Sequence, residues 1–246
     1  MSKHIQVDYK KWGCGSVAKM LAISANDEIV KTALIAIEKI FSVGQFHFES
    51  ALGVNYFQGK NAPDLELLLL RFNTSDTKKN NVGQSHVSVL INPIDNKIFG
   101  YMDLRDSPST IECTTHQAAL QAAVLFLQKS APDFIPQQIQ LPSFPESKVQ
   151  SEAKLTFDNH PKLGVLELHW IGVHKEFVES KNGLIEIRGM KVKLFHRERN
   201  LWSWVIINKN NEVICYERDV FWNFAESRRE SQMWLHDNWR IIHKLI

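Results

Sequence analysis

The stretch WSWVIINKNNEVICYE, residues 202–217, decides the fold more than any other part of the chain. Trp202 and Trp204 are alternate residues in an apolar run, so a strand would place both rings on one face. The asparagine-rich run 208–211 then supplies residues that tolerate left-handed backbone angles, and a second apolar run follows. The stretch therefore predicts an antiparallel β-hairpin.

The hairpin belongs to a tryptophan-rich block that covers residues 164–246. Two further strands are expected at 164–174 and 185–195, where apolar residues alternate with polar ones. From Phe221 onward the apolar residues are spaced as in a helix, and a long terminal helix is predicted. The block is therefore expected to be a sheet closed by that helix.

The N-terminal part predicts a mixture of helices and strands. Ser16 and Asp27 are candidate N-caps, and Thr115 precedes an alanine-rich helical pattern. The expected elements are helices at 16–24, 28–41 and 116–129, a strand at 65–72, a hairpin at 87–103, and loops at 53–63 and 73–84.

These elements indicate an α+β fold, with antiparallel sheets and packed helices. Both halves run from a helix to strands that end in a hairpin, which is compatible with two similar helix-plus-meander units and equally with chance. Prolines and serines between 137 and 162 favour a linker there. The predicted division is an N-terminal α+β unit at 1–140 and a C-terminal tryptophan-rich unit at 141–246.

Composition limits the classes of function. With 29 basic and 27 acidic residues, the net charge of +2 argues against broad nucleic-acid binding. No apolar run is long enough to span a membrane, the N-terminus is polar, and three widely spaced cysteines form no disulfide framework. We expect a cytoplasmic protein that binds a small molecule or a protein partner, with no metal and no cofactor; the oligomeric state is open.

One family resemblance comes from the alanine-rich helix and the hairpin. Residues 115–123 (THQAALQAA) and 205–214 (VIINKNNEVI) follow the order helix, strand, Asn-Lys turn, strand. This unit resembles PepSY-type domains. The resemblance implies a small helix-on-sheet module that binds or inhibits a partner.

A second resemblance centres on Cys14. The run Cys14-Gly15-Ser16-Val17-Ala18 precedes the helix expected at 16–24, and a helix N-terminus lowers the pKa of a thiol. With His86 and Asp103 on successive strands, the order is similar to that of papain-like cysteine peptidases. The resemblance implies that His86 deprotonates Cys14, that Asp103 orients His86, and that Gln6 serves the oxyanion hole. The alternative is that these are unrelated structural residues.

The aromatic block offers a different site. Large aromatic side chains mostly serve burial, so a core between sheet and helix is one interpretation. The other is a ligand pocket with aromatic walls and charged groups, formed by Trp170, Trp202, Trp204, Glu217, Arg218, Arg228, Trp234 and His236. The sequence thus favours a binding protein, with a cysteine-dependent hydrolase or acyltransferase as the alternative.

Overall fold

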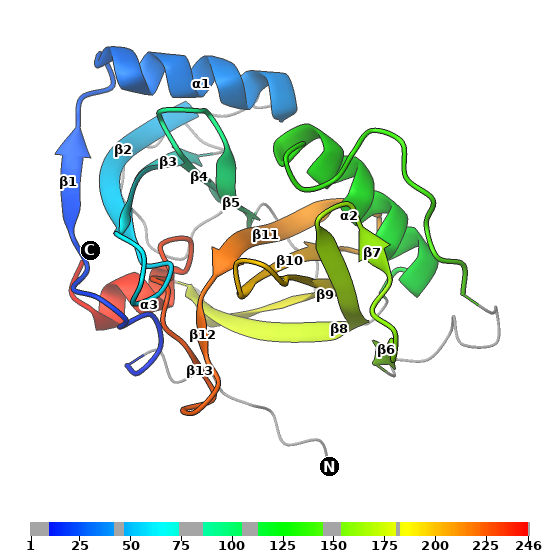
Figure 1. Ribbon diagram of the computed structural model, residues 1–246. Helices are drawn as coiled ribbons and strands as arrows, with labels where there is room; N and C mark the ends of the chain where they lie inside the picture. The colour runs from blue at the N-terminus through cyan, green and yellow to red at the C-terminus, as the bar shows by residue number, and fades with distance from the viewer. Residues whose placement is uncertain are drawn as a thin grey trace.

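A computed structural model gives the fold, and it describes residues 10–41, 47–73, 86–104, 113–144, 154–180 and 183–245. Strands dominate this part of the chain, and Figure 1 shows them in chain order. The strands are β1 (Met20–Ile23), β2 (His47–Tyr56), β3 (Leu65–Asn73), β4 (His86–Ile91), β5 (Ile98–Asp103), β6 (Leu155–Thr156), β7 (Lys162–Leu163), β8 (Leu166–Ser180), β9 (Gly183–His196), β10 (Leu201–Ile207), β11 (Val213–Val220), β12 (Trp222–Asn223) and β13 (Arg228–Arg229). The helices are α1 (Glu28–Ile40), α2 (His116–Ser130) and α3 (Asp237–Ile242).

One large antiparallel sheet organises the molecule. Its strand order is β1-β2-β3-β4-β5-β11-β10-β9-β8-β6, with β7 paired to β8. Strands β2–β5 form one meander and β8–β11 form another, and the two meet where β5 pairs with β11. The short pair β12–β13 forms a separate hairpin beyond β11 (Figure 1).

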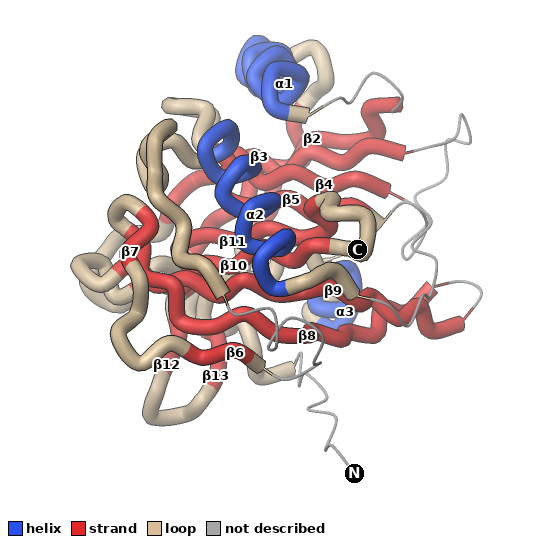
Figure 2. Tube along the Cα trace, turned by 90° about the vertical axis from the view of Figure 1, so that its right-hand side faces the viewer, coloured by secondary structure: helices blue, strands red, loops and turns tan. Residues whose placement is uncertain are grey.

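The sheet has two covered faces. Helices α1 and α2 bury their apolar stripes, including Ile37 and Leu120, against one face. The other face packs against the C-terminal segment, which contributes Trp234 and Trp239 to a second core. Figure 2 shows α1 and α2 on the first face and α3 behind the sheet.

The predicted hairpin at residues 202–217 is confirmed as β10 and β11. Asn211 has a φ of 63°, which is the left-handed conformation that the asparagine-rich turn was expected to need. The hairpin at 87–103, the strand at 65–72 and the two capped helices at 28–41 and 116–129 are also confirmed, within a residue or two at their ends. Asp27 caps α1 through the amide of Ile29, and Thr115 caps α2 through the amide of Ala118.

The predicted α+β class is wrong, because the chain is mostly antiparallel β. Two expected helices do not form. Residues 20–23, inside the helix expected at 16–24, are strand β1 and pair with residues 51–54. The helix propensity of this short stretch is overridden by the hydrogen bonds that the edge of the sheet supplies. The loop expected at 53–63 also starts too early, since β2 continues to Tyr56.

The long C-terminal helix is the second correction. Only residues 237–242 are helical, and the preceding segment forms β12, β13 and an extended stretch. Its backbone carbonyls and side chains bind other parts of the protein: Gly13 N donates to Arg229 O, and Trp234 Nε1 donates to Asn55 O at 2.5 Å. The apolar residues from Phe221 onward are therefore spaced by their burial in an extended segment and not by a helix.

Strands from both sides of residue 140 share the sheet. Helix α2, which the predicted division places in the N-terminal unit, packs on β8–β11 of the C-terminal unit. A short strand, β6, forms within the predicted linker and lies at the edge of the sheet beside β8. The loop expected at 73–84 lies outside the described residues except for Asn73, which ends β3.

Candidate functional site

Lys193 lies at the centre of an aromatic cluster on the sheet face opposite α1 and α2. Its ammonium nitrogen is 4.1 Å from the ring centre of Trp202, 5.5 Å from that of Trp222 and 5.8 Å from that of Trp170. The ammonium of Lys154 lies 4.6 Å from the same Trp170 ring. We call these residues, with His160, His169 and Phe195, the aromatic–lysine face.

Strand geometry explains why these side chains meet. Lys193 on β9 pairs with Trp170 on β8, while Phe195, two residues further along β9, pairs with Trp202 on β10. Residues two apart on a strand point to the same side, so all four side chains share one face. The β12–β13 hairpin adds Trp222, whose ring meets that of Trp12 edge-on at 5.2 Å.

A register shift in β8 places His169 within this face. The shift lies between Leu168 and Trp170, so His169 is the extra residue of a bulge. Its ring stacks on His160 at 3.8 Å and meets Trp202 edge-on at 4.8 Å. Burial, followed by the neighbouring His160, lowers the pKa of His169 to about 4, so this imidazole is neutral at physiological pH.

Three polar atoms in this face are shielded from solvent without a hydrogen-bond partner among the described residues. They are the indole nitrogen Nε1 of Trp202, Nε2 of His169 and Nδ1 of His160. Nε2 of His169 is 3.9 Å from a carboxylate oxygen of Glu167, which is beyond hydrogen-bond distance. Unpaired buried polar atoms are uncommon in proteins and are expected where a ligand completes the bonding.

The charge environment of Lys193 is one-sided. Burial, together with the positive charges of Lys191 and Lys154, lowers its pKa to about 8. Within the part of the chain that the structure describes, no carboxylate contacts Lys193 or Lys154. The acidic residue on the same face, Glu167, is held by Arg197 at 2.6 and 2.8 Å.

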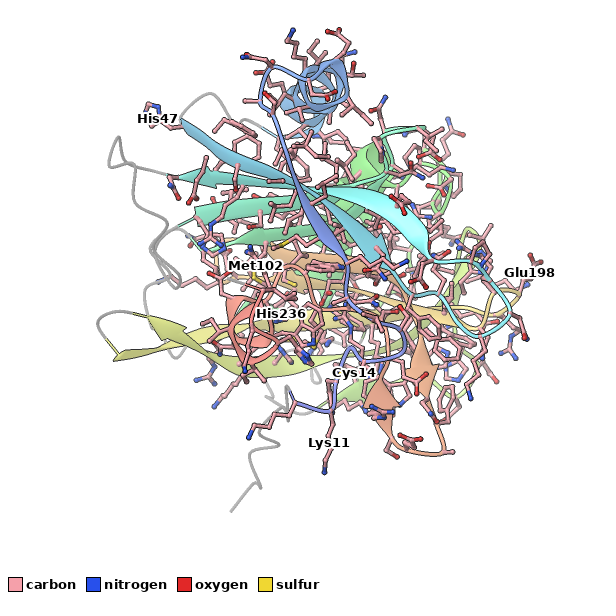
Figure 3. The ribbon with its side chains drawn as sticks, turned by 90° about the vertical axis from the view of Figure 1, so that its left-hand side faces the viewer. Lys11, Cys14, His47, Met102, Glu198 and His236 are labelled. Carbon is pink, nitrogen blue, oxygen red and sulfur yellow. The ribbon has the colours of Figure 1, made fainter. Side chains whose placement is uncertain are left out.

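A buried charge cluster adjoins the aromatic–lysine face under the C-terminal segment. His236 bridges two carboxylates, with Nδ1 2.9 Å from Glu176 and Nε2 3.2 Å from Glu217. Arg229 pairs with the other oxygen of Glu217 at 2.6 Å. Figure 3 views the molecule from the side and labels His236 and, on β5, Met102.

These contacts shift the pKa values of both partners in opposite directions. Burial disfavours the charged imidazole of His236, but the charges of Glu176 and Glu217 outweigh it and raise its pKa to about 9. Burial also opposes ionisation of Glu217, yet Arg229 and His236 lower its pKa to about 2. His236 is therefore a buried cation near neutral pH, and its two carboxylates are ionised.

Most other candidates from the aromatic block belong to this cluster or to other ion pairs. Trp204 lies between Lys191 and Arg229, at 4.1 and 5.6 Å, and the ring of Trp234 is buried. Arg218 donates to both oxygens of Asp133, which follows α2. Thus only Trp170 and Trp202 of the predicted set lie in the aromatic–lysine face.

Arg228 has a separate place in the β12–β13 hairpin. Its guanidinium contacts Glu226 at 2.5 Å and Glu230 at 3.4 Å, and it donates to the carbonyl oxygen of Lys11. These bonds tie the N-terminal segment to the hairpin. The side chain is therefore committed to local ion pairs.

The residues of the predicted thiol triad lie in the N-terminal segment, at the start of β4 and at the end of β5. The sulfur of Cys14 is 3.7 Å from Nε2 of His243, near the C-terminus. His86 is fully buried at the start of β4, and Asp103 accepts a hydrogen bond from Tyr101 at the end of β5. Figure 3 shows Cys14 in the N-terminal segment beside Lys11. Gln6 lies outside the described residues.

The environment of Cys14 does not favour a thiolate. Since residues 20–23 form a strand, the helix whose N-terminus was expected to stabilise the anion is missing from that position. The sulfur lies near the carbonyl oxygens of Lys10 and Trp12, which are hydrogen-bond acceptors. Burial raises the pKa of Cys14 despite the nearby charge of Arg228.

Sequence reasoning missed Lys193, Lys154 and His160. A usable signal was present for the first: Lys191 and Lys193 alternate on a predicted strand, as Trp202 and Trp204 do on the next. Trp222 was assigned to the terminal helix, so its place in the hairpin was hidden. Lys154 and His160 come from the predicted linker, and no local pattern connects them to the sheet.

A shallow depression of about 380 Å³ lies on the opposite face, between the end of α1 and α2. Its lining includes the apolar side chains of Ile40, Leu125 and Phe126 and the polar side chain of Lys129. None of the site residues predicted from the sequence lines it. It is therefore separate from the aromatic–lysine face.

No protein-family model matches the chain, and no match was found among curated proteins or solved structures. Within the described ranges, no three histidine, cysteine, aspartate or glutamate residues are grouped so that they could hold a metal ion. No helix in those ranges has the length and apolar character to cross a membrane.

Proposed function

We propose that the protein is a non-catalytic binding protein and that its ligand occupies the aromatic–lysine face. One observation carries this proposal. Three tryptophan rings surround Lys193 on a partly exposed part of the sheet, and the indole nitrogen of Trp202 in the same cluster has no partner among the described residues.

The degree of exposure supports binding over simple core packing. Trp202 is 9% exposed, whereas Trp170, Trp222 and Lys193 are half-buried at the surface. By contrast, Trp234 and Trp239 are fully enclosed, and their indole nitrogens donate to Asn55 O and Trp12 O. Trp234 and Trp239 thus have the satisfied contacts of a core, whereas Trp170 and Trp222 have the partly exposed rings that stacking ligands use.

A rigid support favours the same interpretation. The face is built on β8, β9 and β10, and β8 and β9, with 15 and 14 residues, are the longest strands of the described sheet. Side chains on paired strands hold their positions better than side chains on loops, which limits the entropy lost when a ligand binds. The adjoining charge cluster fixes the C-terminal segment and with it the base of the hairpin that carries Trp222.

The proposal is tested by titrating the protein with a panel of flat aromatic molecules of different charge, followed by tryptophan fluorescence. At least one compound is expected to change the emission in a saturable way. Replacing Trp170 by Leu should weaken that response, while the exposed Ile94→Ala exchange in the turn between β4 and β5 serves as the control. A panel without a saturable response, or an unchanged response in Trp170→Leu, would contradict the proposal.

A further inference from the structure

The aromatic–lysine face has positive charge that the protein does not neutralise. Lys193 and Lys154 contact tryptophan rings, and within the described residues neither reaches a carboxylate. Glu167, the acid on this face, is already engaged by Arg197. Cations grouped without anions repel one another, so an added anion would be stabilised there.

A hydrogen-bond donor in the same place is also unsatisfied. Trp202 is more than nine-tenths buried, and its Nε1 has no acceptor among the described residues. A buried donor without a partner is destabilising, and an acceptor on a ligand would recover that loss. An indole N–H can only donate, so the missing partner is an acceptor.

The flat surfaces around these groups define the rest of the ligand. The rings of Trp170 and Trp222 are partly exposed beside Lys193, and Phe195 lies 4.6 Å from Trp202. Aromatic rings stack with other flat rings, and the lysine side chains have the freedom to move from a ring face to an anion. The indole donor and the lysines would therefore bind an anionic acceptor, and the tryptophan rings would bind a flat ring of the same molecule.

We infer that the ligand is a small flat aromatic molecule with an anionic group, carboxylate or phosphate, beside Lys193, Lys154 and the indole nitrogen of Trp202. This rests on the proposed function and adds the chemical class of the ligand. The ring of the ligand stacks on the tryptophans. Its anion pairs with the ammonium groups and accepts a hydrogen bond from the indole N–H. The neutral state of His169 leaves that imidazole able to complete the hydrogen bonding.

Calorimetric titration with four probes tests the inference: 2-naphthoate, 2-naphthyl phosphate, the neutral 2-naphthamide, and cyclohexanecarboxylate, which has the charge without the flat ring. We expect one or both naphthyl anions to bind at least about tenfold more tightly than the amide, because a charge-assisted bond contributes on this order. Cyclohexanecarboxylate should bind more weakly than 2-naphthoate. The tighter of the two naphthyl anions identifies the anionic group.

Variants then localise the effect. Lys193→Met keeps the aliphatic stem and should reduce the preference for the anion over the amide by about tenfold. Trp202→Phe keeps a ring and removes the donor, and it should weaken the anion more than the amide. Lys209→Met, in the exposed turn between β10 and β11, should leave all affinities unchanged. Near-ultraviolet circular dichroism checks that each variant is folded.

The outcomes separate the two proposals. If 2-naphthamide binds as tightly as the anions, the ligand class is overturned while the binding function stands. The same holds if Lys193→Met leaves the preference intact. If cyclohexanecarboxylate equals 2-naphthoate, the aromatic requirement is overturned. If none of the four probes binds and the wider aromatic panel is also silent, the proposed function itself is contradicted.

Discussion

At the scale of single residues, the most consequential side chain is His236. It is a buried cation between Glu176 and Glu217, and it joins the C-terminal segment to strands β8 and β11. Desolvating three charged groups is costly, and their mutual contacts offset that cost only while all are present. The imidazole of His236 therefore stabilises the attachment of the segment, together with the Arg229–Glu217 ion pair.

His236→Gln should destabilise the fold by about 3–5 kcal/mol, because it leaves two buried carboxylates without their shared cation. Urea unfolding followed by tryptophan fluorescence measures the change. The control is His47→Gln, since His47 is exposed at the start of β2. A loss below 1 kcal/mol in His236→Gln would show that the cluster does not hold the segment.

The same histidine predicts how stability varies with pH. Its folded pKa of about 9 exceeds the unfolded value near 6.5, so folding is favoured where the imidazole binds a proton. This contribution, about 3 kcal/mol, is complete below pH 6.5 and is lost as pH rises through 9. The difference between the wild type and His236→Gln should therefore be large at pH 6 and small at pH 10. A difference that grows with pH would contradict the assignment.

Cys14 should behave as an unactivated thiol. Burial raises its pKa, so its rate of alkylation in the native protein should keep rising above pH 8.5. Mass spectrometry locates the adduct among Cys14, Cys113 and Cys215. A rate that levels off below pH 7 would mean that the thiolate forms easily, and would instead favour the cysteine-dependent alternative.

At the scale of elements, the C-terminal segment explains why the terminal helix was predicted and why it does not form. Residues 229–236 are buried: Met233, Trp234 and Leu235 belong to the core, while the side chains of Ser231 and Gln232 bind the backbone of Phe57. Arg229 donates to two carbonyl oxygens within the segment, and the amides of Gly13 and Gly15 bond to Arg229 O and Glu230 O. An extended backbone offers these bonds to neighbours, whereas a helix would use them internally.

Ser231 gives a direct test of this account. Its hydroxyl donates to Phe57 O at 2.6 Å and accepts from Phe221 N at 2.8 Å, and it is fully buried. Ser231→Ala should cost about 2–3 kcal/mol, since two buried backbone groups lose their partner. Thermal and urea unfolding measure it against the exposed Ser143→Ala. Equal stability of the two variants would contradict the role of the segment.

The elements that could be predicted were those with local causes. Asp27 and Thr115 mark two helix starts, and the turn at 208–211 marks the central hairpin. Strand β1 and the segment 229–236 could not be predicted, because their conformation depends on partners far away in the sequence. Lys154, Lys193 and Trp222 meet for the same reason: they come from three separate segments that only the sheet and its hairpin bring together.

At the scale of the whole molecule, two four-stranded meanders share one sheet through β5 and β11. Each meander follows a helix in the chain, and both helices cover the same face (Figure 2). A duplication of one unit stays a prediction that the order of the elements allows. The opposite face is the one that differs between the halves, since the strands beneath the aromatic–lysine face are β8, β9 and β10.

The central claim is that this face binds an anionic aromatic ligand through Trp202. The most direct measurement is a titration of protein labelled with ¹⁵N-tryptophan with 2-naphthoate, in which the indole N–H resonances are followed by NMR. Trp234 and Trp239 act as internal controls, because their indole nitrogens already donate to Asn55 O and Trp12 O. We predict a saturable downfield shift of the Trp202 resonance, assigned by its loss in Trp202→Phe, with little change at Trp234 and Trp239. An unchanged Trp202 resonance at saturating 2-naphthoate would contradict the account.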